Sequence, residues 1–538
     1  MFYKPEIAYD AVSKVWSSRA EFDHFAPDLS IGEIIYREMQ RHPQQIAQIS
    51  VTERTELRRD ELHLNSKAVA SYMRQLGLLQ TDIVGIVARN TTHLSAVAYG
   101  CFYMGIAFHS LNINYEQATI SQLFNITKPR LLFCDGDEYE MLKAATKQLD
   151  CYIVTMRRHV AGVMSIEQVL QTPVPLDFKP AKLQQGNNQT LAILCTIGTP
   201  KAVTITNSRK ILNGNLMLTT SDVQYSHRTL DCLTSLITTI TTAVFSTKRI
   251  IADNAFDAEQ TLRLIETYKV SWLLLAPAHF GSLVSSPLFE RTSLDSVQHC
   301  MFTGGRCSLR VQQALRQRLS SDGMHFAYGM TEVGSWATLN WNFDEKPTSV
   351  GRPTAGFQLK IIDERNAARG PNELGEICLH NGQYWAGYFG DPQESQQLRD
   401  AAFWFHTGDL GYVDADGFLY VLDRNKEIVK HQNIMYYHNE LEELIARMPQ
   451  VADVCVFGIW SERNGDEPAA VVVKRAGAEL QAAEVVAYVQ QHVAAHYKQL
   501  IGGALIVDDL QRSPNGKINR AANKSHFLQV KGQIEKSN

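Results

Sequence analysis

The 538-residue sequence lacks the features that mark disulfide-rich, zinc-binding or nucleic-acid-binding proteins. Its nine cysteines are scattered singly, without a C-x-x-C pair, so neither a disulfide framework nor a zinc site is indicated and a reducing compartment is expected. Lys+Arg number 52 and Asp+Glu 56, and the resulting net charge of -4 offers no overall attraction to nucleic acid or an anionic membrane surface.

Long hydrophobic runs are also missing. Residues 1–11 carry several charges, which argues against a secretory signal, and the apolar stretch 233–245 is Thr-rich and shorter than the ~20 residues that cross a bilayer. The final Lys-Ser-Asn differs from the Ser-Lys-Leu type of peroxisomal address. We therefore expect a cytoplasmic protein without a transmembrane segment, and a peroxisomal location would need another route.

The pattern along the chain predicts a layered α/β fold. The length exceeds what one core usually organises, so at least two domains are expected. Amphipathic helical patterns alternate with short apolar runs that are typical of buried strands, and ligands of such sheets collect at the strand ends. The clearest predicted strands are residues 83–87, 191–195, 272–275 and 324–328.

Between residues 351 and 422 the sequence pattern changes to short strand-like runs separated by turn signals, which predicts a β-rich subdomain. Afterwards the α/β pattern returns, with helices expected near 438–448 and 482–496 and strands at 454–457 and 469–473. We predict a large N-terminal domain, 1–425, of α/β subdomains plus the β-rich subdomain. A small mobile C-terminal α+β domain, 426–538, would follow it.

The most specific local motif is Tyr328-Gly329-Met330-Thr331-Glu332, which follows a predicted strand. It places a hydroxyl and a carboxylate at a strand end, and the Glu332 carboxylate is a ligand type that Mg²⁺ prefers. By itself the motif is equally compatible with a simple turn in which Thr331 caps a helix.

Further motifs in a fixed order decide between these readings. They are residues 349–353 (SVGRP), 375–378 (GEIC), 387–389 (GYF), 404–411 (WFHTGDLG), 423–424 (DR) and 514–520 (PNGKINR). With this series the chain resembles the adenylate-forming superfamily of acyl- and aryl-CoA synthetases, peptide-synthetase adenylation domains and firefly-type luciferases. The resemblance extends over nearly the whole sequence.

This resemblance implies ATP and Mg²⁺ as cofactors and a nucleotide site built from several separated residues. Asp409 would accept hydrogen bonds from the ribose hydroxyls, with Arg424 nearby. Small residues would admit adenine, and the phosphate loop would cradle the phosphates. The implied nucleotide-binding residues are Thr199, Lys201, Gly304, Gly305, Tyr328, Gly329, Asp409, Arg424 and Lys517.

The resemblance also implies the catalytic groups. Lys517 would bridge the substrate carboxylate and the nucleotide, while Thr331 and Glu332 would act beside the phosphates, with Glu332 as the metal ligand. Lys426 would be a hinge about which the small domain rotates, presenting Lys430 for a second reaction with coenzyme A. The alternative for Lys426 and Lys430 is a basic surface patch.

Several positions depart from the family pattern. The phosphate loop, 195–202, is three residues shorter, which removes donors where pyrophosphate charge develops. Residues 233–237 contain no histidine where luciferase-like relatives carry one beside the acyl pocket. Arg306 replaces a small residue near the nucleotide pocket, and Asn433 replaces a glycine near the CoA channel.

Three hypotheses follow from this pattern. The first is an acyl-CoA synthetase that activates a small-molecule acid with ATP and transfers it to CoA. The apolar content of residues 230–239 and 301–303 favours a fatty or aromatic acid. The second is an inactive nucleotide- or acyl-binding descendant, and the third is a luciferase-like monooxygenase.

Overall fold

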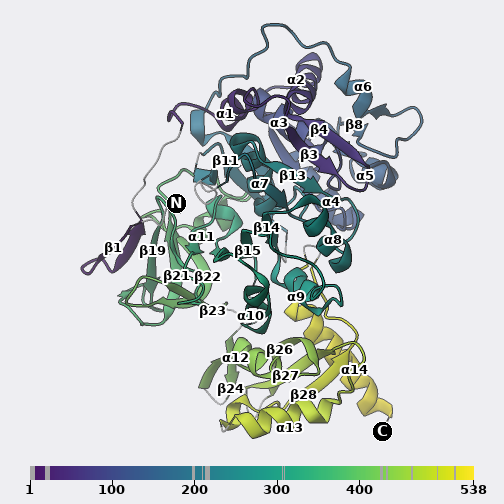
Figure 1. Cartoon of the computed structure of the whole chain (residues 1–538). Helices are drawn as coiled ribbons and strands as arrows, with labels where there is room; N and C mark the ends of the chain where they lie inside the picture. The colour runs from purple at the N-terminus through teal and green to yellow at the C-terminus, as the bar shows by residue number, and fades with distance from the viewer. Residues whose placement is uncertain are drawn as a thin grey trace.

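The computed structural model of the chain describes residues 6–18, 25–196, 200–208, 210–212, 218–305, 307, 309–424, 428–431, 434–461, 465–493, 495–513 and 516–537. Figure 1 shows a large body of sheets and helices, with a smaller body formed by the C-terminal segment packed beneath it. Within the described chain no helix combines the length and apolarity that a membrane crossing requires.

The large sheet has nine strands in the order β18-β17-β16-β15-β14-β12-β13-β3-β4. The central pairs from β3 to β16 are parallel, while the pairs at both edges are antiparallel. Its strands are Ile46–Ser50 (β3), Thr55–Arg58 (β4), Val223–Tyr225 (β12), Lys248–Ile251 (β13), Trp272–Leu275 (β14), His299–Thr303 (β15), Met324–Tyr328 (β16), Thr338–Asn340 (β17) and Arg352–Pro353 (β18).

A second sheet of seven strands has the order β11-β10-β6-β5-β7-β8-β9 and is parallel except for the β10–β11 hairpin. Its strands are Ile83–Val87 (β5), Ala107–Ser110 (β6), Leu131–Cys134 (β7), Tyr152–Thr155 (β8), Met164–Ser165 (β9), Thr190–Cys195 (β10) and Ala202–Thr206 (β11). The expected strands 83–87, 272–275 and 324–328 match β5, β14 and β16 residue for residue, and 191–195 differs from β10 by one residue.

The β-rich subdomain is an antiparallel sheet that also recruits the N-terminal hairpin, which the sequence pattern did not indicate. Strand β2 pairs with β19, more than three hundred residues away. The strands are Ile7–Asp10 (β1), Val15–Ser18 (β2), Gln358–Ile362 (β19), Ala368–Arg369 (β20), Gly375–His380 (β21), Phe405–Val413 (β22) and Leu419–Arg424 (β23).

The small C-terminal body has its own sheet and its own apolar core. The strands are Ile428–His431 (β24), Ile434–Tyr437 (β25), Val451–Ser461 (β26), Gly465–Lys474 (β27) and Gly503–Val507 (β28), and the helices are His438–Ile445 (α12), Ala482–His492 (α13) and Arg520–Ser537 (α14). This mixed α/β architecture confirms the predicted fold class. The predicted domain boundary stays a prediction, because residues 425–427 lie outside the described residues.

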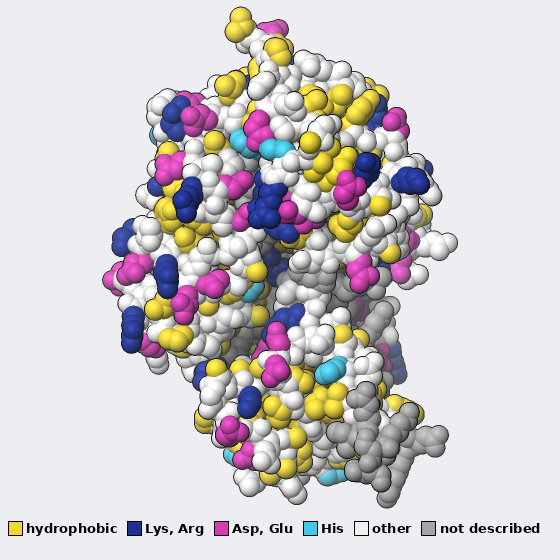
Figure 2. All heavy atoms as spheres, turned by 90° about the vertical axis from the view of Figure 1, so that its right-hand side faces the viewer, with side chains coloured by type: hydrophobic (Ala, Val, Ile, Leu, Met, Phe, Trp, Pro, Cys, Tyr) yellow, Lys and Arg dark blue, Asp and Glu magenta, His cyan; other side chains and the backbone are white. Residues whose placement is uncertain are grey.

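Helices cover the nine-stranded sheet and the second sheet, except for α11, which contacts β22 of the β-rich sheet. They are Ile31–Glu38 (α1), Arg59–Gln75 (α2), Leu94–Met104 (α3), Gln117–Thr127 (α4), Tyr139–Ala145 (α5), Ile166–Leu170 (α6), Leu233–Phe245 (α7), Ala258–Tyr268 (α8), Pro277–Ser285 (α9), Leu309–Arg318 (α10) and Pro392–Leu398 (α11). Ser30 and Glu33 form a capping box that starts α1. On the face shown in Figure 2, basic and acidic side chains are interspersed, as expected from the nearly balanced charge.

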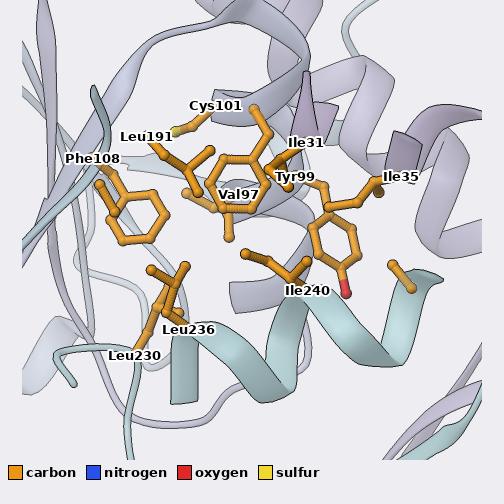
Figure 3. Packing of buried hydrophobic residues seen from close by; sticks show 14 of the residues in the cluster. Ile31, Ile35, Val97, Tyr99, Cys101, Phe108, Leu191, Leu230, Leu236 and Ile240 are labelled. Atoms are coloured by element: carbon orange, nitrogen blue, oxygen red, sulfur yellow. The ribbon is translucent and has the colours of Figure 1, made fainter. Parts of the chain in front are cut away.

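Helix α7 lies at the centre of the largest apolar core. Its Leu236 and Ile240 are fully buried and pack, four residues apart, toward Val97, Tyr99 and neighbouring side chains from other elements (Figure 3). The stretch 233–245 is thus a buried helix of the protein core.

Replacing Leu236 by Ala should lower the free energy of unfolding by about 3 kcal/mol, because the side chain is fully buried and a cavity would remain. Denaturant unfolding followed by circular dichroism measures the loss. Leu64→Ala on α2, where the side chain is 53% exposed, is the matched control and should change stability little. Equal losses in the two variants would contradict this packing of α7.

Candidate active site

The candidate site begins where β15 and β16 end at the carboxyl edge of the large sheet. Gly304 and Gly305 follow β15, and Gly329 follows β16. Gly304 has φ +82°, and a Cβ on Gly329 would lie 2.8 Å from the Ser335 carbonyl oxygen. Gly304 and Gly329 therefore require glycine, whereas a Cβ on Gly305 would make only ordinary contacts with Pro277 at 3.8 Å or more. All three leave backbone exposed for close approach by a flat ligand.

The β-rich subdomain contributes the second part of the site. The Tyr328 hydroxyl donates a 2.7 Å hydrogen bond to Oδ2 of Asp409 on β22. Asp409 faces Arg424 across the β22–β23 pair, and only the backbone of Arg424 is described. Residues 328, 409 and 424, which the motifs singled out separately, thus meet where the two sheets join.

Glu332 lies in the short 3-10 turn Thr331–Val333 directly after this edge. Its side chain is buried, and Oε1 accepts a 2.7 Å hydrogen bond from the Tyr388 hydroxyl. Burial, followed by the charge of Glu332, holds the pKa of Tyr388 far above its usual value, so the phenol stays a donor. One buried carboxylate suits a Mg²⁺ ion that takes its other ligands from substrate phosphates and water.

The predicted phosphate loop is a tight connection between β10 and β11. The Thr196 amide donates to the Lys201 carbonyl at 3.1 Å, and the Lys201 amide donates to Thr196 Oγ1 at 2.9 Å. Thr199 lies outside the described residues. Residues 197 and 198 lie outside the described residues as well, so the effect of the shortened loop on phosphate binding stays a prediction.

The Lys201 ammonium is already engaged. It pairs with Glu394 Oε2 at 2.5 Å and lies 5.0 Å from the centre of the Tyr388 ring. Tyr388 therefore links Lys201 to Glu332, so the predicted phosphate lysine and the predicted metal ligand share one neighbour. A polyphosphate bound here would have to compete with Glu394 for Lys201.

Lys517 of the small C-terminal body lies at the carboxyl edge of the large sheet. Lys517 follows Gly516, which has φ +82°, and the Ser513 amide donates to the Lys517 carbonyl at 2.8 Å to close the turn. A Cβ built on Gly304 would lie only 3.6 Å from Lys517 Cε. The structure thus brings the predicted catalytic lysine to the predicted nucleotide glycine, although more than two hundred residues separate them.

Two neighbours were not singled out from the sequence, because they belong to no motif. Arg228 follows β12, and its Nη2 lies 3.7 Å from the same Cβ position on Gly304. The adjacent His227 ring packs edge-on against Phe256 and His279. An imidazole therefore does lie next to Arg228 although residues 233–237 contain none. Burial lowers the pKa of His227 to about 4 and that of His279 to about 3, so both are neutral near pH 7.

The structure leaves some predicted residues untested. Lys430 lies in the middle of β24 opposite Met435, and only its backbone is described. Arg306, Lys426 and Asn433 lie outside the described residues. The hinge and the second-reaction site consequently stay predictions.

Comparison with known proteins agrees with this geometry. The chain is 26% identical to a luciferin 4-monooxygenase of Luciola mingrelica, covering 84% of this chain and 86% of the relative. It is also 26% identical to a 4-coumarate:CoA ligase of Petunia hybrida, covering 86% and 87%. Among solved structures, the anthranilate CoA ligase AuaEII in complex with anthranoyl-AMP superposes with a TM-score of 0.86 at 18% identity, covering 94% of this chain and 98% of that one. ATP-bound MatB from Rhodopseudomonas palustris superposes with a TM-score of 0.84 at 20% identity, covering 93% and 100%.

Two sequence families match the chain in the expected order. The AMP-binding enzyme family covers residues 35–389, and the AMP-binding enzyme C-terminal domain covers residues 440–517. The first match includes the glycines at the sheet edge and Glu332, and the second ends at Lys517. The chain therefore belongs to the AMP-binding enzyme family, within the adenylate-forming superfamily.

Proposed function

We propose that the protein uses ATP to convert a carboxylic acid into an acyl-adenylate and then into its CoA thioester. The observation that supports this most directly is the approach of Lys517 to Gly304, 3.6 Å from the position of a Cβ there. A lysine that reaches the nucleotide glycines from a separate body suits a reaction in which two anionic substrates must be held together.

In the first step an oxygen of the acid attacks the α-phosphorus of ATP. The new bond is the acyl–phosphate C–O–P linkage, and the bond that breaks joins the α-phosphorus to the departing pyrophosphate. Lys517 and Arg228 offset the negative charge of the two reactants at this point, while Asp409, oriented by Tyr328, holds the ribose hydroxyls. Glu332 would hold Mg²⁺, which supplies further charge neutralisation when bound.

In the second step the CoA thiolate attacks the acyl carbon and AMP leaves. Lys430 on β24 and a rotation about residue 426 would prepare this step. Asn433, which lies outside the described residues, would add a side chain beside the expected CoA channel where the family commonly has glycine. The acid itself is proposed to be fatty or aromatic, since residues 230–239 and 301–303, which the resemblance places beside the acyl pocket, have a high apolar content.

A second candidate is a protein that binds AMP or acyl-adenylate without turning over ATP. The shortened phosphate loop favours it, because three residues fewer supply fewer donors to the phosphates, and loss of one comparable donor costs ~3 kcal/mol of barrier, about a hundredfold in rate. A luciferase-like monooxygenase is the third candidate. Assaying the purified protein for light emission with luciferin, ATP and oxygen tests it directly.

Replacing Lys517 by Ala should abolish acid-dependent pyrophosphate release, because in the proposed reaction its ammonium bridges the acid carboxylate and the nucleotide. The measurement is pyrophosphate release from ATP and Mg²⁺ over a panel of fatty and aromatic acids. Lys524→Ala on α14 is the matched control, with unchanged release expected. Native protein that binds AMP but releases no pyrophosphate with any acid would contradict the proposal and support the second candidate.

Lengthening the turn between Thr196 and Lys201 by three Gly, Ser or Thr residues separates the two candidates further. If the native turn supports adenylation, pyrophosphate release should change by less than about tenfold, because Lys517 and the residues at the sheet edge carry the reaction. A rate of pyrophosphate release about a hundredfold or more higher than that of the native protein would instead show that the short turn prevents adenylation. The same assay measures both results, and unchanged AMP binding shows that the variant is folded.

A further inference from the structure

Arg249 is a buried cation without an anionic partner. It lies in the middle of β13, between Gln224 of β12 and Gln48 of β3 in register, and its relative exposure is 3%. Within the described part of the chain, no carboxylate forms an ion pair with it. Its Nη1 donates to Thr239 Oγ1 at 2.8 Å and its Nη2 to Ser235 Oγ at 3.3 Å, while Nε has no acceptor.

A second buried arginine, Arg59, has the contacts expected of a residue that only stabilises the fold. Arg59 is also fully buried, but its guanidinium donates to four backbone carbonyl oxygens. They belong to Glu38, Arg41, Thr242 and Ala243, the last two at the C-terminal end of α7, where the helix dipole favours a cation. Arg249 instead lies at the N-terminal half of the same helix, where the dipole is unfavourable for a cation.

The surroundings of Arg249 therefore favour an anion. Ser235 belongs to the first turn of α7, and the N-cap residue Cys232 makes no side-chain hydrogen bond to the helix. The acidic residue nearest in sequence to this turn, Asp231, is engaged by Asn112 and Thr229. An unpaired guanidinium N–H and a helix N-terminus with no side-chain cap together provide what a carboxylate needs.

Arg249 is linked to the candidate active site through α7. Ser235 Oγ donates to the Arg228 carbonyl at 3.0 Å, and the Arg228 side chain approaches Gly304 opposite Lys517. Leu236 and Ile240 point to the apolar core (Figure 3). Ser235 and Thr239, one residue before each, therefore form a separate hydroxyl-bearing face of the helix, which contacts Arg249. Hydrogen bonds thus connect Arg249, through Ser235, to the backbone of Arg228.

We propose that Arg249, with Ser235 and Thr239, is a specificity site for a second carboxylate at the far end of the substrate acid. The proposal rests on the proposed function for the reacting end of that acid. It narrows the substrate class from fatty or aromatic acids in general to those that carry a distal anionic group. One carboxylate would react near Gly304 and Lys517 while the other would pair with Arg249.

The test compares linear dicarboxylic acids with the monocarboxylic acids of the same chain length. Binding to the native protein is measured by calorimetry with AMP and Mg²⁺ present, and pyrophosphate release from ATP is measured separately. At the favoured length the dicarboxylic acid should bind about tenfold or more tightly, because it gains charge-assisted hydrogen bonds to Arg249. Equal or weaker binding of the dicarboxylic acids at every length would overturn the proposal.

Arg249→Met should remove this preference while leaving the binding of monocarboxylic acids unchanged or stronger. Arg59→Met is the matched control: it loses a cation of similar burial at the other end of α7, so it should lower the melting temperature and keep the preference. If Arg249→Met does not fold, Arg249→Lys should retain a reduced preference. A preference that persists unchanged in Arg249→Met would overturn the assignment.

The two readouts keep this proposal separate from the proposed function. Pyrophosphate release with monocarboxylic acids, without preference for dicarboxylic ones, would support adenylation and refute the Arg249 site. Preferential binding of dicarboxylic acids that is lost in Arg249→Met, without any pyrophosphate release, would support the Arg249 site and refute turnover.

Discussion

The parallel pairing of β12, β14, β15 and β16 is the constraint on which the candidate active site depends. Parallel strands end at one edge of a sheet, so His227 and Arg228, Pro277, Gly304 and Tyr328 come together although the segments between them are long. The β-rich subdomain adds Asp409 through its bond to Tyr328, and the small body adds Lys517. Each of the three bodies thus supplies part of one site.

Electrostatic pairing distinguishes groups that hold the fold from groups that are available to a ligand. Arg59 is saturated by carbonyl oxygens, and Arg89 and Arg157 pair with the buried Asp135. At the site edge Lys201 and Glu332 share the neighbour Tyr388, and under the proposed function these contacts would be exchanged for phosphate and metal contacts. Arg249 has only hydroxyl partners, which is unusual for a buried cation.

The short connection between Thr196 and Lys201 is the feature that argues against turnover of ATP. It gives the chain fewer backbone donors for pyrophosphate than an extended loop would provide. The glycines at the sheet edge, Asp409, Glu332 and Lys517 are nevertheless present and placed around one edge. The short connection therefore bears on the height of the barrier to adenylation, and not on whether the site is present.

The sequence alone determined the α/β architecture, the positions of several buried strands and the residues that belong to motifs. Strands such as Ile83–Val87 and Met324–Tyr328 were predictable because buried parallel strands are continuous apolar runs bounded by turn signals. The motif residues could be named because backbone geometry and ligand chemistry limit each position to one residue type, as for Gly329.

The tertiary structure alone decided which unmarked residues surround the site. The pairing of β2 with β19 has no local signal, because a strand's partner depends on topology and not on its own sequence. Arg228 and Arg249 look like ordinary charged residues in the sequence, and only packing against Gly304 and α7 gives them a role. A buried charge needs polar partners because its transfer from water costs free energy, and only the folded chain determines which charges are buried.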